Sequence, residues 1–195
     1  MDMYQETRAR ITEFLAGTYE VIYADPPWSY RQNGGPKGKR GMASAHYGCM
    51  GLDALAALPV DKLAAPGGCA LFLWATGPML EEALLLMGAW GFEYKGIAFT
   101  WAKTNRKGPG WFWGMGSYTR ANAELCLLGV THGYKAGKHV RSHGVHQIIA
   151  SPVRRHSEKP PEVRDRIVQL LGDVPRTELF ARQRADGWDA WGDEL

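Results

Sequence analysis

The chain has 195 residues, of which 45% are hydrophobic, and carries a formal net charge of +3. This length suits one well-buried domain, and we expect a single domain over residues 1–195. The start of the chain lacks a secretion-signal pattern and no apolar run reaches membrane-spanning length, so we expect a soluble cytoplasmic protein without a membrane partner. The cysteines lack disulfide-framework or zinc-site spacing and are expected to be reduced thiols in or near the core: Cys49, Cys69 and Cys126.

The predicted elements alternate between helices and strands. Apolar residues at helical spacing predict three helices: one over 4–16, one after Gly77-Pro78 with Leu80, Ala83, Leu84 and Met87 on one face, and one after Pro160-Pro161 with Val163, Ile167, Leu170 and Leu171 on one face. Short apolar runs predict five strands: 19–24, 69–76, 96–103, 123–130 and 177–182. This order predicts an α/β fold, a single Rossmann-like doubly wound sheet with long active-site loops.

One predicted strand ends abruptly in the sequence VIYADPPWSY, residues 21–30. Its continuous apolar start is typical of a strand covered on both faces of a parallel sheet. Pro26 and Pro27 must end the strand, because each has a fixed φ and no backbone N–H. The stiff turn therefore holds a carboxylate (Asp25), the Pro26 carbonyl and an aromatic face (Trp28) where open α/β sheets bind ligands.

Several other chemistries are disfavoured by the sequence. The glycine-rich GGPKGKR has Arg40 where a phosphate loop needs Ser or Thr, so that interpretation fails. The chain contains neither GxSxG nor GxGxxG, which disfavours a serine nucleophile and the usual dinucleotide site. His139, His143 and His146 have the spacing of metal ligands, but no acidic residue or cysteine lies near them in the sequence. We therefore predict that they belong to a basic, titratable loop and bind no metal.

The turn at Asp25 suits the chemistry of an aromatic amine. The exocyclic amine of adenine is a poor nucleophile, because its lone pair is delocalised into the ring. A carboxylate and a carbonyl at one rigid turn can accept its two N–H bonds and direct the lone pair toward an electrophile. Trp28 is expected to stack on the base, which must be flipped out of a duplex or presented single-stranded.

The ordered set of motifs resembles the N6-adenine methyltransferases related to the catalytic subunit of the messenger-RNA adenosine methyltransferase, a family with bacterial and phage members. The resemblance covers nearly everything after residue 19. It rests on ADPPW (24–28), HY (46–47), LFLWAT (71–76), WAKTN (101–105), NAE (122–124), HSEKP (156–160), ELFAR (178–182) and GWDAWGDE (187–194).

This resemblance implies roles for the matching positions. The turn Asp25-Pro26-Pro27-Trp28 would be catalytic, with Asp25 binding the amine near the sulfonium of S-adenosylmethionine. The carboxylate of this cofactor would contact Lys159. Further cofactor residues follow in the last motifs: Glu178, Phe180, Arg182, Arg184, Asp193 and Glu194. Substrate-binding residues are expected in the other motifs and loops: Tyr30, His46, Tyr47, Lys103, Asn105, Asn122 and Glu124.

The sequence departs from the family pattern at two places. Asp193 stands where relatives commonly have Asn. An ionised Asp side chain cannot donate the hydrogen bond that an amide could give the cofactor, but it can accept one from a hydroxyl group. Eukaryotic relatives have a strand ahead of ADPPW that supplies cofactor contacts, whereas this chain is predicted to have a short helix there. That part of the pocket is expected to be simpler or to be completed by a neighbouring chain.

Two long glycine-rich segments, 29–51 and 103–120, carry several aromatic residues and are expected to form a mobile gate over the target base. Basic residues gather in 31–41 and 134–159, which flank the predicted site and favour a nucleic-acid partner. The chain shows no added RNA-binding module, which favours DNA over RNA. We expect a homodimer in which the basic segment 134–156 supports the nucleic acid or forms the dimer edge.

Three other functions stay open at this point. The same fold in this family serves RNA adenosine methyltransferases. Some members have lost DPPW and act as non-catalytic nucleic-acid-binding subunits, a role that the intact turn of this chain disfavours. A related turn also serves methyltransferases that act on a protein amide or a free base.

Overall fold

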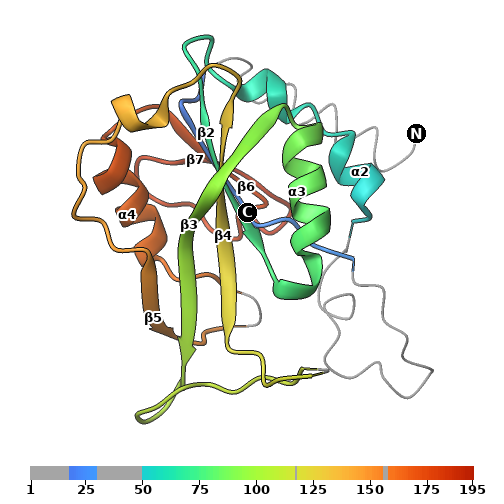
Figure 1. Ribbon diagram of the computed structural model, residues 1–195, viewed down its shortest axis with the longest axis vertical. Coiled ribbons are helices and arrows are strands. Elements are labelled where there is room, and N and C mark those ends of the chain that lie inside the picture. The colour runs from blue at the N-terminus through green and yellow to red at the C-terminus, as the bar shows by residue number, and fades with distance from the viewer. Residues whose placement is uncertain (1–17, 30–49, 117, 156–157) are drawn as a thin grey trace.

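A computed structural model describes residues 18–29, 50–116, 118–155 and 158–195. The described part of the chain holds seven strands in one mixed sheet, in the order β5-β3-β4-β2-β1-β6-β7 (Figure 1). The strands are β1 (Val21–Ala24), β2 (Ala70–Ala75), β3 (Phe92–Thr104), β4 (Ala123–Thr131), β5 (Ile148–Pro152), β6 (Arg176–Leu179) and β7 (Asp189–Trp191). The helices are α2 (Leu52–Ala56), α3 (Leu80–Ala89) and α4 (Glu162–Leu171), with short 3₁₀ turns at Val60–Leu63, Gly77–Met79 and Ala136–Lys138.

The two central strands are buried along their whole length, as their continuous apolar sequences predict. Neighbouring side chains of a strand point to opposite faces, so β1 and β2 feed two separate cores. Ile22 and Leu71 pack in the core that includes residues of α2 and α3, whereas Tyr23 and Phe72 pack in the core that includes residues of α4. Figure 1 shows α3 and α4 on opposite sides of the sheet, which confirms the predicted α/β fold.

The sheet is mixed because β4 runs antiparallel to both of its neighbours, β2 and β3. In contrast, β1 is parallel to β2 and β6, as expected from its sequence. The antiparallel direction brings the first residues of β4 to the edge of the sheet where β1 and β2 end. Ala24 pairs with Leu73 and Ala75 pairs with Leu125, so Asp25 and Glu124 both lie at this carboxyl edge.

Several element boundaries differ from the predictions. Strand β3 begins at Phe92, four residues earlier than expected, and β5 and β7 were not predicted as strands. Helix α3 buries Ala83, Leu86 and Met87, whereas the predicted face residue Leu84 is exposed. Helix α4 ends at Gly172, which has a φ of 90°, as the sequence indicated. The predicted helix 4–16 lies outside the described residues.

Among the described residues, Cys69 and Cys126 are buried free thiols, as predicted, and Cys49 lies outside the described residues. Burial raises the pKa of both thiols well above the ordinary value. Among the described helices, none is long and apolar enough to cross a membrane.

Candidate active site

The turn after β1 is held by backbone hydrogen bonds on both sides. Trp28 N–H donates to the Pro26 carbonyl at 2.9 Å, and Met50 N–H donates to the Pro27 carbonyl at 2.9 Å. Because a carbonyl oxygen has two lone pairs, the Pro26 oxygen keeps one for a ligand. The turn is therefore stiff, and Asp25 projects from its start at the carboxyl edge.

Trp28 is placed differently from the expectation that it stacks on a base. Trp28 is 5% exposed and packs in the core that contains Ala75 and Met79. Its Nε1 donates to the Trp74 carbonyl at 3.2 Å, which joins the turn to the end of β2. A ring buried in this way has no face open for stacking, so in this structure Trp28 anchors the turn that carries Asp25.

Asp25 belongs to a chain of four alternating charges. Lys159 Nζ lies 2.7 Å from both carboxylate oxygens of Asp25 and 3.4 Å from Oε2 of Glu124. The other oxygen of Glu124, Oε1, accepts a hydrogen bond from Nζ of Lys103. The side chains of Lys159 and Glu124 are 8% and 9% exposed, so these charges compensate one another largely out of water.

The environment separates the pKa values of the two carboxyl groups. Burial raises the pKa of Asp25 above its ordinary value, although the Lys159 ammonium opposes the rise. Burial acts on Glu124 in the same direction, but Lys159 and Lys103 together hold its pKa below the usual range. Burial would lower the pKa of Lys159, yet the charges of Asp25 and Glu124 outweigh it and raise that pKa. Asp25 is therefore the carboxyl group whose charge is held less firmly.

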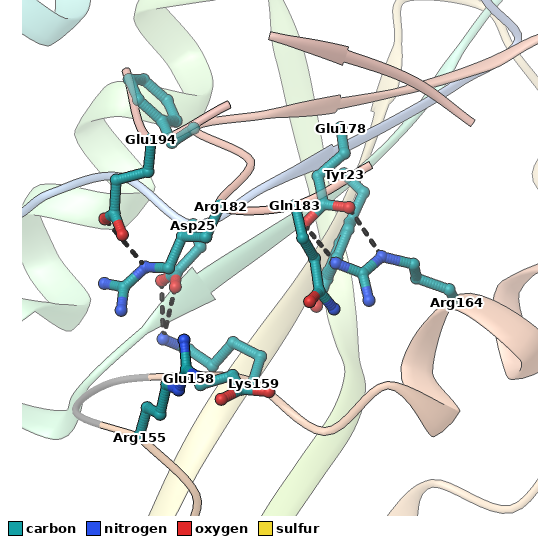
Figure 2. Close-up of a pocket in the computed structure, with 11 residues that line it drawn as sticks. Tyr23, Asp25, Arg155, Glu158, Lys159, Arg164, Glu178, Arg182, Gln183 and Glu194 are labelled. Carbon is teal, nitrogen blue, oxygen red and sulfur yellow. Dashed lines mark hydrogen bonds and ion pairs between the residues drawn. The ribbon is translucent and has the colours of Figure 1, made fainter. Parts of the chain in front are cut away.

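A pocket opens beside Asp25 and encloses about 670 Å³ of empty space, part of it open to solvent. Figure 2 shows its labelled residues and the ion pairs that order them. The lining residues are Tyr23, Asp25, Arg155, Glu158, Lys159, Arg164, Glu178, Phe180, Arg182, Gln183 and Glu194. Six of these are residues for which the family resemblance implies a catalytic or cofactor-binding role: Asp25, Lys159, Glu178, Phe180, Arg182 and Glu194.

Helix α4 fixes one side of the pocket through a bidentate ion pair. Arg164 Nε and Nη2 lie 2.6 and 2.8 Å from the two carboxylate oxygens of Glu178, a residue of β6 (Figure 2). Burial raises the pKa of Glu178, and the Arg164 guanidinium opposes this effect. The paired oxygens can still accept hydroxyl hydrogens, because each oxygen has a second lone pair.

The segment after β6 is held in an unusual conformation. Phe180 has a φ of 60°, a region that bulky side chains rarely adopt, and its ring lies edge-on to Trp191 at 5.4 Å. Ala181 N–H donates to the Trp191 carbonyl at 2.9 Å. A Cβ on Gly192 would lie 2.1 Å from the Ala181 oxygen, so this close approach requires glycine. The strained turn presents Phe180 and Arg182 to the pocket.

The remaining predicted residues are placed elsewhere. Arg184 and Asp193 are exposed and are not among the described residues that line the pocket. Asn105 and Asn122 use their side-chain amides within the segment between β3 and β4: Asn105 Nδ2 donates to the Pro109 carbonyl at 3.1 Å, and Asn122 Nδ2 donates to the Lys103 carbonyl at 2.9 Å. Tyr30, His46 and Tyr47 lie outside the described residues.

Sequence reasoning missed five pocket residues: Tyr23, Arg155, Glu158, Arg164 and Gln183. Tyr23 carried a signal, because it is the next-to-last residue of a strand whose end was already a candidate site. Arg164 carried no such signal: it stands one residue after the buried Val163 in α4, and charged residues commonly flank the apolar stripe of a helix.

Comparison with known proteins gives the family. The model of the MT-A70 family matches residues 19–194. The type II methyltransferase M.MunI of a Mycoplasma species is 36% identical over 194 residues, which cover 91% of this chain and 78% of M.MunI. The N(6)-adenine-specific methyltransferase METTL4 of Homo sapiens and a putative N(6)-adenosine-methyltransferase of Medicago truncatula are each 29% identical, and this chain covers 38% and 27% of their lengths. The chain therefore belongs to the MT-A70 family.

Proposed function

We propose that the protein transfers a methyl group from S-adenosylmethionine to the N6 amine of adenine in DNA. The observation that carries the proposal is the Asp25 carboxylate, which Lys159 holds at 2.7 Å beside a pocket lined by residues of the family motifs. Adenine as the target is supported by the names of two relatives, METTL4 and the Medicago protein. DNA is supported by the higher identity and coverage of the type II methyltransferase M.MunI.

The turn of Asp25 would orient the target amine. In our proposal one amine N–H donates to the Asp25 carboxylate and the other donates to the free lone pair of the Pro26 oxygen. These two acceptors would direct the nitrogen lone pair away from the turn and toward the pocket. Lys159 then acts as a positioning residue, because its contacts with both Asp25 oxygens fix the plane of the carboxylate.

The chemistry of the pocket fits S-adenosylmethionine. When bound, this cofactor supplies a methyl group on a positively charged sulfur. Its amino, carboxylate and sulfonium groups match a lining with four acidic residues (Asp25, Glu158, Glu178 and Glu194) and four basic residues (Arg155, Lys159, Arg164 and Arg182). We propose Glu178 and Glu194 for hydroxyl or amino groups and Phe180 for the adenine ring. Lys159 already faces two carboxylates, so a cofactor carboxylate at Lys159 would compete with them.

Methyl transfer to duplex DNA, single-stranded DNA and RNA of the same sequence, measured side by side with labelled cofactor, tests the proposal. We expect N6-methyladenine in DNA, and we expect Asp25→Ala to abolish transfer while calorimetry finds cofactor affinity within a few-fold. Transfer to RNA in preference to DNA would overturn the polymer, and a normal rate for Asp25→Ala would overturn the role of the turn. Cofactor binding without methylation of any polymer would favour a non-catalytic subunit.

We also propose that the active form is a homodimer. The support is that the basic side chains of the segment 134–156 lie at the surface of the molecule: Lys135, Lys138, Arg141, Arg154 and Arg155 are exposed. Such a surface on one copy would stabilise nucleic acid that enters the pocket of the other copy. The molar mass from light scattering at micromolar concentration, together with the methylation rate of the same sample, tests this proposal. A monomer with full activity would contradict it.

A further inference from the structure

The segment that joins β3 to β4 exposes large aromatic side chains. We call residues 105–116 and 118–122 the arm. Trp111 is 47% exposed, Trp113 is 61% exposed and Tyr118 is fully exposed. Aromatic rings of this size are normally buried, and several of them exposed on one segment mark a binding surface.

The charge of the same segment points to the kind of partner. Arg106, Lys107 and Arg120 are exposed, and the sequence from 105 to 122 contains no Asp or Glu. Basic residues interleaved with aromatic rings suit a polyanion whose flat bases can stack, because the two features recognise phosphate and base separately. An apolar protein partner would not require the three charges.

The arm is ordered by its own hydrogen bonds. Asn105 N–H donates to the Gly110 carbonyl at 3.1 Å, and Gly114 N–H donates to the Ala121 carbonyl at 2.7 Å. Asn122 Nδ2 donates to the Phe112 carbonyl at 2.6 Å as well as to the Lys103 carbonyl. Trp111 and Trp113 are thus presented on a backbone that these hydrogen bonds hold in place, which lowers the entropy cost of binding.

The position of the arm places it next to the candidate active site. It extends beyond the carboxyl edge of the sheet, at the bottom of Figure 1. Lys103 lies in β3, two residues before the arm, and pairs with Glu124. Glu124 in turn lies next to Lys159, the partner of Asp25. A polymer strand that enters the site can therefore continue onto the arm.

We propose that the arm binds the nucleotides that flank the target adenine in a single strand or in an opened duplex. Their bases stack on Trp111, Trp113 and Tyr118, and their phosphates contact Arg106, Lys107 and Arg120. This inference rests on the proposed function and names the part of the chain that holds the polymer. It differs from the expected gate over the target base, because the arm contacts the neighbouring nucleotides.

Fluorescence anisotropy with a labelled single-stranded oligonucleotide that contains one adenine tests the proposal. Trp111→Ala/Trp113→Ala is expected to raise Kd at least about fivefold, the smallest effect of a lost base–aromatic stack. Arg106→Ala/Lys107→Ala is expected to reduce the slope of log Kd against log salt by about 1.4, at ~0.7 for each single-strand phosphate.

Matched controls lie at the opposite end of β3. Tyr94 is 48% exposed and Lys95 is exposed, and Tyr94 lies ten residues before Thr104 in the same strand. Tyr94→Ala and Lys95→Ala should leave Kd and the salt slope unchanged. Thermal unfolding and cofactor affinity verify that each variant folds, and Trp113→Ala alone serves as a milder variant.

The outcomes separate this inference from the proposed function. If the wild type methylates adenine and both arm variants keep its Kd and salt slope, the arm proposal is wrong and the function stands. If the wild type binds the strand through the arm but methylates nothing, the function fails and the arm stands. If the arm variants keep strand binding but change the sedimentation mass, the arm is an interface between copies and the proposal is overturned.

Discussion

Replacing Lys159 by Met removes the positive charge between the Asp25 and Glu124 carboxylates and nearly preserves the side-chain volume. The ammonium lies 2.7 Å from Asp25 and 3.4 Å from Glu124. With an effective dielectric constant of 20, unit charges at these distances attract by about 6 and about 5 kcal/mol, and desolvation of several kcal/mol per ion opposes this attraction. Removing one partner of such a buried pair costs about 3–5 kcal/mol, so Lys159→Met should lose that much free energy of unfolding at pH 7.

The loss should depend on pH in a predictable direction. In the wild type, the pKa of Glu124 is lower in the folded protein than in the unfolded chain. The resulting stability is present at pH values above the pKa of Glu124 in the unfolded chain, and it is lost as pH falls through the pKa of Glu124 in the folded protein. Without the ammonium, the pKa values of Asp25 and Glu124 both rise, and each buried charge destabilises the variant above the unfolded pKa. The difference in stability between wild type and variant should therefore shrink toward pH 4.

Urea unfolding at several pH values, followed by tryptophan fluorescence, measures this difference. The matched control is Lys95→Met, which removes a lysine from the exposed pair with Glu93 and should change stability little at any pH. A loss below about 1 kcal/mol at pH 7, or a loss that does not vary with pH, would show that the charges do not depend on one another as the contacts indicate.

Three further predictions concern the pocket. Arg164→Ala should leave the Glu178 carboxylate buried without its ion-pair partner, so we expect a loss of about 3–5 kcal/mol in the free energy of unfolding in urea and weaker cofactor binding by calorimetry. Arg164→Lys should lose less stability, because it keeps the positive charge, and equal losses for the two variants would contradict this. The methylation rate should fall on acidification at a higher pH than for an ordinary aspartate, because burial raises the pKa of Asp25 and protonation removes an acceptor; a rate that stays flat down to about pH 4 refutes this. Gly192→Ala should destabilise by about 1–3 kcal/mol because its Cβ would lie 2.1 Å from a carbonyl oxygen, whereas Gly67→Ala, with nothing within 4 Å, should be nearly neutral in the same assay.

Local sequence was sufficient where a single segment determines the structure. The strand before Asp25 and the end of α4 at Gly172 were predicted because apolar runs, prolines and glycine act within a few residues. Strand β5 was missed because its sequence does not follow its burial: Ile148 is exposed and Ser151 is buried. Strand β7 was missed because it is only three residues long. The antiparallel β4 had a readable signal: no helical pattern separates it from β3, and antiparallel neighbours need no crossover helix.

The contacts within the site were beyond sequence reasoning for a different reason. The family motifs indicated that Asp25 and Lys159 are both functional, but not that Lys159 spans two carboxylates. Likewise, nothing near Arg164 in the sequence identifies Glu178 as its partner, because that pair forms only when α4 packs on the sheet. The buried position of Trp28 also depends on packing, since a tryptophan after a turn is equally compatible with an open face.

The wide sequence separation of the paired charges has a consequence for the folding of this chain. Asp25 and Lys159 are 134 residues apart, so their contact closes one of the longest loops in the chain and carries a correspondingly high entropic cost. Synthesis proceeds from the N-terminus, so the turn with Asp25 leaves the ribosome long before its ammonium partner is made. Until the segment after β5 docks, a nascent chain has the motif but not the compensated carboxylate, so we expect this charge pair to form late in folding.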